Sequence, residues 1–123
     1  MNIQGKVWGT TSSLFSKNNV EINRITCVKD GYCSKHKHTS KYNMFFVEKG
    51  ILEIKVWKND YDLVDTTILK EQQNCIVDPG EYHSFKCVED DTVAFEIYWV
   101  EINRNDIERK CVGGIIEQEK KDI

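Results

Sequence analysis

A chain of 123 residues fits a single domain around one hydrophobic core. Its 40% hydrophobic and 30% charged residues are the proportions of a globular protein, unlike those of a disordered or fibrous chain. The net charge of -3 argues against a general affinity for nucleic acid, and no stretch approaches the roughly 18 apolar residues that a membrane span requires.

The first nineteen residues read as an entry of strand and loop whose role the sequence does not fix. From residue 20 onward, short runs rich in Val, Ile, Phe, Tyr, Trp and Thr predict strands rather than helices. The first three runs are Val20 to Lys29, Met44 to Val47 and Leu52 to Trp57. In the third run, apolar side chains alternate with charged ones, which indicates a strand with one buried face.

Four further strand-length runs follow, separated by turn residues. They are Leu63 to Ile68, Cys75 to Val77, His83 to Cys87 and Thr92 to Val100. Lys58-Asn59-Asp60 predicts a hairpin before the first of them, and Asp78-Pro79-Gly80 predicts a tight turn before the third. Strands spaced by roughly ten residues with turns between them predict an all-β sandwich or small barrel.

The residues after Glu101 change in character and form a polar tail, 102–123. Within it, Asn103 to Lys110 is mildly helical in pattern, and Glu117 to Asp122 is almost entirely charged, so we expect the last residues to be frayed. The sequence therefore divides into an entry (1–19), a barrel (20–101) and this tail.

Five cysteines are spread along the chain without a close pair. An odd, scattered set fits free thiols in a reducing compartment better than a disulfide framework. We also find no secretory signal at the N-terminus, and we expect a cytoplasmic protein. Most of the cysteines are expected to be small buried hydrophobic residues. They are Cys27, Cys33, Cys75, Cys87 and Cys111.

The three histidines of the chain fall in two groups. His36 and His38 stand two residues apart, so that on an extended strand both rings project from one face and can share an ion. His83 follows the turn at Pro79 and Gly80. Imidazole is a ligand that suits Fe, Ni, Cu and Zn, so a mononuclear metal site is the main hypothesis. The alternative is that the three are ordinary surface or loop residues.

This pattern resembles the cupin family over roughly residues 20–100. The first cupin motif is a glycine, a His-x-His pair, a glutamate and a closing glycine, and the second is a proline and glycine turn followed by a histidine. The first is matched by Gly31, His36, His38 and Gly50, with the opening spacing one residue short. The second is matched by Pro79, Gly80 and His83. The resemblance implies a double-stranded β-helix, a jelly-roll-like barrel with the metal inside.

The family's ligands carry over to the three histidines, but the position of the glutamate holds Asn43. Three neutral imidazoles leave the full charge on a divalent ion, which makes it the stronger Lewis acid. Asn43 is then either a weak ligand through its amide oxygen or a hydrogen-bonding neighbour of a ligand or water. Fe(II) is the favoured ion, with Ni, Mn and Zn as alternatives.

The resemblance leads us to expect a metal-dependent enzyme that acts on a small chelating metabolite. Three-histidine cupins without the glutamate resemble the thiol and diketone dioxygenases, while lyase or isomerase chemistry would use the ion only as a Lewis acid. One alternative is a non-catalytic cupin that binds or senses a sugar or sugar acid. Another is a sugar-nucleotide isomerase or epimerase that needs no metal, since the fold alone does not fix function.

Several further residues are candidates for the site. Tyr98 and Glu96 are candidates for acid–base chemistry, because a carboxylate facing the barrel would have a raised pKa, although we favour an outward orientation for both. Tyr82 and Cys33 are more peripheral candidates. The substrate pocket is assigned to Asn43, Phe45, Tyr42 and Phe85.

The surroundings of the histidines bear on the partners of the chain. Lys35, Lys37 and Lys41 interleave with His36 and His38, and they either attract an anionic substrate or are solvated loop residues. We expect a small-molecule substrate and no nucleic-acid or membrane partner. A homodimer is expected as well, because cupins commonly pair through their outer strands and an open barrel leaves edges to protect.

Overall fold

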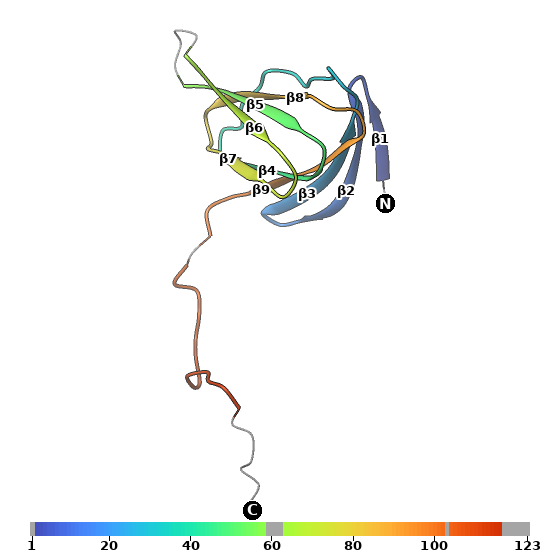
Figure 1. The fold of residues 1–123 in the computed structure, drawn as a ribbon. Coiled ribbons are helices and arrows are strands. Elements are labelled where there is room, and N and C mark those ends of the chain that lie inside the picture. The colour runs from blue at the N-terminus through green and yellow to red at the C-terminus, as the bar shows by residue number, and fades with distance from the viewer. Residues whose placement is uncertain (1, 59–62, 103, 117–123) are drawn as a thin grey trace, which may run out of the picture.

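The computed structural model describes residues 2–58, 63–102 and 104–116, and these residues form an all-β structure (Figure 1). Nine strands lie within the described ranges. They are β1 (Asn2–Lys6), β2 (Gly9–Lys17), β3 (Val20–Cys27), β4 (Tyr42–Lys49), β5 (Leu52–Trp57), β6 (Val64–Leu69), β7 (Asn74–Val77), β8 (Tyr82–Cys87) and β9 (Thr92–Trp99).

The strands form two antiparallel sheets that face each other. The larger sheet has the order β1-β2-β3-β9-β4-β7, and the smaller one has the order β6-β5-β8. Figure 1 shows the smaller sheet lying across the larger one, with β1 at an outer edge. Every run of residues 20–100 predicted as a strand overlaps a strand of the structure, and the predicted all-β barrel is confirmed.

The core lies between the two sheets and follows from the alternation of the strands. In β4, Phe45 and Val47 are buried, and in β5 the same is true of Leu52 and Ile54. Phe85 of β8 completes this group. Burying each such side chain contributes about 1.5–3 kcal/mol, which is why the period-two pattern of β5 was readable from the sequence.

The structure extends the predicted entry of strand and loop, and it differs from the prediction in where the first two histidines lie. Residues 1–19 contain two full strands, because β2 pairs with β3 along nearly its whole length and β1 pairs with β2. His36 and His38 lie outside the named strands, on the segment between β3 and β4, where His36 forms an isolated antiparallel bridge with His83. This segment is extended, but it bonds β8 through single bridges rather than a continuous ladder.

The residues that follow β9 also differ from the prediction. The described part of the segment predicted as mildly helical, 104–110, contains only a turn at Arg104 and Asn105, and it is exposed. The predicted turn residues Asn59 and Asp60 and the charged run from Glu117 onward lie outside the described residues. In the described ranges no helix is suited to spanning a bilayer.

The cysteines agree with the expectation of free thiols, since all five are unpaired. Cys27 and Cys87 are buried, Cys33 and Cys75 are half-buried, and Cys111 is exposed. Four of the five thus pack as small apolar side chains.

Candidate metal centre

Backbone hydrogen bonds bring the two histidine groups together. The His36 amide donates to the His83 carbonyl at 3.1 Å, and the His83 amide donates to the His36 carbonyl at 2.8 Å. The Gly80 amide donates to the His38 carbonyl at 2.7 Å, which ties the turn before β8 to the same segment. The segment of the first motif therefore runs directly beside the strand of the second.

The three imidazoles converge as the sequence predicts. One ring nitrogen of each lies within 4.8 Å of the corresponding atoms of the other two. The ring centroids of His36 and His83 are 4.6 Å apart, and those of His38 and His83 are 5.3 Å apart. A single ion placed among these nitrogens would contact all three, so the chain presents a three-histidine cluster of the kind that holds a mononuclear metal.

The hydrogen bonds of the rings determine which nitrogen is free. His36 Nδ1 lies 2.8 Å from the carbonyl oxygen of Ser34, and His83 Nδ1 lies 3.0 Å from that of Glu81. A carbonyl only accepts, so Nδ1 carries the proton in both rings and Nε2 keeps its lone pair. Metal-binding histidines in proteins commonly donate their second N–H to a carbonyl in this way.

His38 supports the same reading by a different observation. Its Nε2 is buried and has no hydrogen-bond partner among the described residues. Burial lowers the pKa of His38 to about 4, with a further contribution from the positive charge of Lys41, and burial also lowers the pKa of His83. Both rings are therefore neutral at pH 7, which is the form that binds metal, and the donor set fits a divalent ion.

Asn43 lies beside this cluster, as its place in the motif implies. Its side chain is 1% exposed, and Nδ2 lies 3.4 Å from His83 Nε2. The amide oxygen Oδ1 is buried without a hydrogen-bond partner in the described parts of the chain. Asn43 therefore offers an uncharged oxygen or N–H group next to the imidazoles, in place of a carboxylate.

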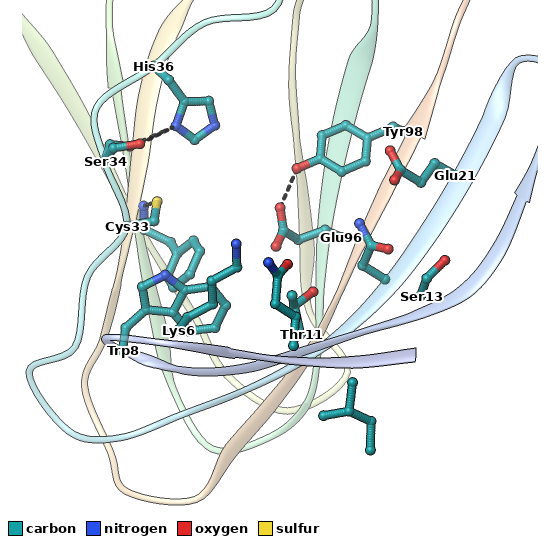
Figure 2. A pocket seen from close by; sticks show the side chains of 14 residues that line it. Lys6, Trp8, Thr11, Ser13, Glu21, Cys33, Ser34, His36, Glu96 and Tyr98 are labelled. Atoms are coloured by element: carbon teal, nitrogen blue, oxygen red, sulfur yellow. Dashed lines mark hydrogen bonds between the residues drawn. The ribbon is translucent and has the colours of Figure 1, made fainter. Parts of the chain in front are cut away.

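A cavity of about 640 Å³ lies beside the cluster, and of the three histidines it is His36 that lines this cavity (Figure 2). Figure 2 shows Cys33, Ser34 and His36 on one side of it and Glu21, Glu96 and Tyr98 on the other. Its wall is completed by residues of β1, β2 and β3 and by the turn between β1 and β2. These are Ile3, Gln4, Lys6, Trp8, Thr11, Ser13 and Asn23, and Phe85 of β8 also lines the cavity.

Glu96 and Tyr98 face this cavity, which corrects the outward orientation favoured from the sequence. The Tyr98 hydroxyl donates a hydrogen bond to Glu96 Oε2. Burial is the main cause that raises the pKa of Glu96, and burial together with the nearby Glu96 carboxyl raises the pKa of Tyr98. The Tyr98 ring also meets His38 edge to face, with centroids 5.3 Å apart, so the pair links the cavity to the cluster.

The predicted pocket residues are distributed differently. Phe85 lines the cavity, while Phe45 belongs to the core and meets the His83 ring edge to face at 6.2 Å. Tyr42 stacks on Trp99 with ring centroids 5.5 Å apart and is not among the described residues that line the cavity.

The two peripheral candidates also have clear positions. Tyr82 is 44% exposed and lies near the ammonium group of Lys37. Cys33 lines the cavity, where its sulfur accepts a hydrogen bond from the Phe85 amide. Burial raises the pKa of the Cys33 thiol to about 11, so at pH 7 it is a neutral neighbour of the site rather than a nucleophile.

The sequence did not point to the wall that β1, β2 and β3 contribute. Its polar side chains, among them Thr11, Ser13 and Asn23, have the pattern of a solvated strand face, and nothing local places them opposite Glu96. Asn23 and Glu96 are polar residues at paired positions of neighbouring strands, but only the structure establishes that pairing.

Comparison with known proteins supports the fold. No family model matches the sequence, and no curated protein is significantly similar to it. The structure is similar to KdgF from Halomonas sp., with a TM-score of 0.71, 10% identity and coverage of 83% of this chain and 90% of that one. The cupin domain of Cnp3 from Schizosaccharomyces pombe gives a TM-score of 0.68 and 16% identity, over 82% of this chain and 69% of that one.

A variant of oxalate decarboxylase from Bacillus subtilis is also similar, with a TM-score of 0.71 and 10% identity. It is matched over 80% of this chain but only 27% of its own length. The chain thus has the cupin fold that its two motifs imply, with a three-histidine cluster at the expected place. Identities this low establish the fold and leave activity to be argued from the site.

Proposed function

We propose that this chain is a metal-dependent cupin enzyme that acts on a small chelating metabolite. His36, His38 and His83 would hold one divalent ion, for which Fe(II) is favoured and Ni, Mn and Zn are alternatives. The observation that carries the proposal is the hydrogen bonding of the ring nitrogens in the three imidazoles. Two of them donate Nδ1–H to backbone carbonyls, and the third has a buried nitrogen without a partner in the described residues.

The ion, when bound, would act as a Lewis acid that polarises a chelating oxygen of the substrate and, as Fe(II), would allow dioxygenase-like chemistry. The residues of the chain would set the charge around the ion and provide space for the substrate. Three neutral imidazoles beside an uncharged Asn43 leave the positive charge of the ion undiminished. The cavity on the His36 side gives a substrate room to reach the cluster without displacing a ligand.

Glu96 and Tyr98 would handle protons in this mechanism. At neutral pH the Tyr98 hydroxyl keeps its proton, because both burial and the neighbouring carboxyl raise its pKa. Glu96 lies between that hydroxyl and the open cavity, so its carboxyl is placed to give a proton to a bound substrate or take one from it. By donating a hydrogen bond to Oε2, the phenol favours the carboxylate form and so partly opposes the effect of burial on the pKa of Glu96.

The same pair favours a second candidate function, an isomerase or epimerase that needs no metal. A buried carboxyl with a raised pKa next to a phenol can shuttle protons by itself, and the His36 imidazole lines the same cavity. The two candidates differ in one measurable property, because only the first loses activity when metal is removed.

Metal content tests the first candidate. The chain is purified without a histidine tag under anaerobic conditions, loaded with Fe(II), desalted and analysed by inductively coupled plasma mass spectrometry. We expect stoichiometric iron in the wild type and a loss of most of it in His83→Ala, because that variant removes one of three ligands. Lys86→Ala, an exposed position on the same strand, is the control and should retain the metal.

Oxygen uptake is then followed with thiols, diketones and small acids. Circular dichroism checks that His83→Ala is folded, and His36→Gln provides a second ligand variant. A wild-type chain that holds no stoichiometric metal after anaerobic loading contradicts the proposal. Activity that survives excess chelator supports the metal-independent candidate instead.

A further inference from the structure

The cavity wall contains a row of hydrogen-bonding side chains that crosses three strands. Ser13 of β2 pairs with Asn23 of β3, and Asn23 pairs with Glu96 of β9. All three line the cavity, and paired side chains on one face of a sheet stand about 5 Å apart. Thr11 extends the row along β2, and Gln4 of β1 lies opposite Thr11. The result is a patch of closely spaced donors and acceptors.

Three side chains of this row have hydrogen-bonding groups without a partner among the described residues. Within the described residues, no hydrogen bond occupies the side chains of Thr11, Ser13 or Asn23, although Thr11 and Asn23 are half-buried. A ligand without hydrogen-bonding groups would cover them and leave them unsatisfied, at a cost that disfavours binding. A ligand that carries several hydroxyl groups would satisfy them.

An aromatic pair also contributes to the wall of the cavity. Trp8 and Phe85 meet edge to face with ring centroids 4.9 Å apart, and both line the cavity. A surface that combines aromatic carbon with amide and hydroxyl groups suits a molecule whose C–H groups and hydroxyl groups point in different directions. Sugars and polyols have this character, whereas simple diketones and thiols do not.

The charges of the cavity limit the ligand further. Among the described residues that line the cavity, Lys6 supplies an ammonium group, and Glu21 and Glu96 supply carboxyl groups. Lys41 Nζ lies 3.8 Å from Glu21 Oε2 and offsets the charge of that carboxylate, while the Tyr98 hydroxyl donates a hydrogen bond to Glu96. This balance lacks the cluster of cations that a di- or triphosphate requires, but it admits a neutral molecule or one with a single carboxylate.

We infer that the cavity binds a polyhydroxylated small molecule, a polyol or sugar-like compound that is neutral or carries one carboxylate. This names the substrate class of the proposed enzyme and rests on that proposed function for its catalytic meaning, though not for binding itself. Adjacent oxygen atoms of such a compound would also form a chelating pair on the His36 side of the cavity, which joins the two parts of the site.

Ligand-observed saturation-transfer NMR on the full chain, loaded with Zn(II), tests the inference. The probes are glucose, glucitol and gluconate, compared at equal concentration with acetylacetone and cysteine. Thr11→Val removes one lining hydroxyl without changing the shape of the side chain, and Asn23→Leu removes the central amide of the row. Thr67→Val makes the first change at an exposed position of β6, outside the cavity, and is the matched control.

We expect saturation transfer to at least one polyhydroxylated probe, with affinity reduced about tenfold in Thr11→Val or Asn23→Leu and unchanged in Thr67→Val. Thermal melts check that each variant is folded. Binding of acetylacetone or cysteine alone, or polyol binding that neither cavity variant weakens, overturns the inference. Metal content is measured on the same samples, so polyol binding by a chain that holds no metal retains the inference and removes the proposed metalloenzyme.

Discussion

Glu96 shows how a single residue couples the site to the stability of the chain. Its carboxyl faces the barrel interior, and burial raises its pKa above the ordinary value of 4.5. The folded chain therefore keeps a proton that the unfolded chain releases at lower pH. By linkage, this carboxyl decreases the free energy of unfolding as the pH rises from about 4.5 through the folded pKa.

Glu96→Gln should remove this pH dependence. The amide keeps a similar shape and still accepts a hydrogen bond from Tyr98, but it has no proton to lose. In chelator-treated protein we expect the variant to be more stable than the wild type at pH 7, with the difference shrinking toward zero below about pH 4.5. Urea unfolding between pH 4 and 8 measures this, and Glu71→Gln at an exposed position is the control. A difference that does not vary with pH would refute the assignment.

Asn43 is the residue that sets the charge of the proposed metal centre. It is buried with its amide next to His83, where the family resemblance implies a glutamate. Asn43→Asp adds a carboxylate of nearly the same shape to three neutral imidazoles, and carboxylates favour hard ions such as Mn(II).

We expect Asn43→Asp to raise the affinity for Mn(II) by about tenfold or more, equivalent to roughly 1.4 kcal/mol, as measured by isothermal titration calorimetry. Without metal the variant should be less stable than the wild type, since it buries a charge. Asn43→Leu, which has no donor atom, is the comparison. Equal Mn(II) affinity in Asn43→Asp and the wild type would show that this side chain does not reach the ion.

At the scale of the elements, two glycines mark where the strands turn. Gly50 lies between β4 and β5 at φ +90°, and Gly80 lies before β8 at φ +83°. A Cβ on Gly50 would stand 2.2 Å from Thr92 Oγ1, whereas a Cβ on Gly80 would meet nothing within 4 Å. Both positions carry the backbone cost of a left-handed residue, but only Gly50 adds a collision.

Gly80→Ala should therefore destabilise the chain by about 1 kcal/mol, and Gly50→Ala by about 3 kcal/mol or more. Chemical denaturation of the two variants beside the wild type measures both values. Thr92 Oγ1 also donates to the carbonyl of Glu89 at 2.6 Å, so the Gly50 variant must disturb a second turn when it pushes Thr92 aside. Equal losses in the two variants would mean that the β4–β5 turn relaxes freely.

The strands themselves were predictable to different degrees. β5 has the predicted bounds because Leu52, Ile54 and Val56 alternate with charged residues, a pattern that local chemistry fixes. β1 and β2 were predicted only as an entry of strand and loop, because many of their residues are polar and their strand state comes from the pairing of β1 with β2 and of β2 with β3. Tertiary pairing of this kind leaves no periodic signal in the sequence.

The whole molecule explains why the three-histidine cluster was predictable and the cavity was not. The spacing of His36, His38 and His83 survives as a motif, since the segment before β4 and the turn before β8 are each local. The cavity arises only when β1, β2 and β3 fold against β9, and its polar wall looks like an ordinary solvated face. Polar residues that face the interior of a barrel depart from the usual alternation of buried apolar and exposed polar side chains, so the sequence pattern alone assigns them to the outside.

The orientation of Glu96 was mistaken for a related reason. Larger apolar residues occupy the alternate positions of its strand, and the apolar face of a strand is ordinarily the buried one. In the structure this apolar side faces out. One of its residues, Ile97, belongs to an apolar row across the large sheet, called the outer row here, in which each residue is paired with the next. The outer row is Phe15, Ile22, Ile97, Met44 and Ile76, in order from β2 to β7. Phe15 and Ile76 are 47% and 49% exposed at its two ends.

An apolar row across five neighbouring strands is more than a soluble sheet needs on its outer face, and it would be covered if two copies packed large sheet to large sheet. We therefore expect a homodimer in solution, with Ile97 near the centre of the contact. Light scattering coupled to size exclusion should give twice the monomer mass for the wild type and the monomer mass for Ile97→Lys. Thr67→Lys, exposed on the smaller sheet, should remain dimeric. Monomeric wild type at tens of micromolar would contradict the predicted homodimer.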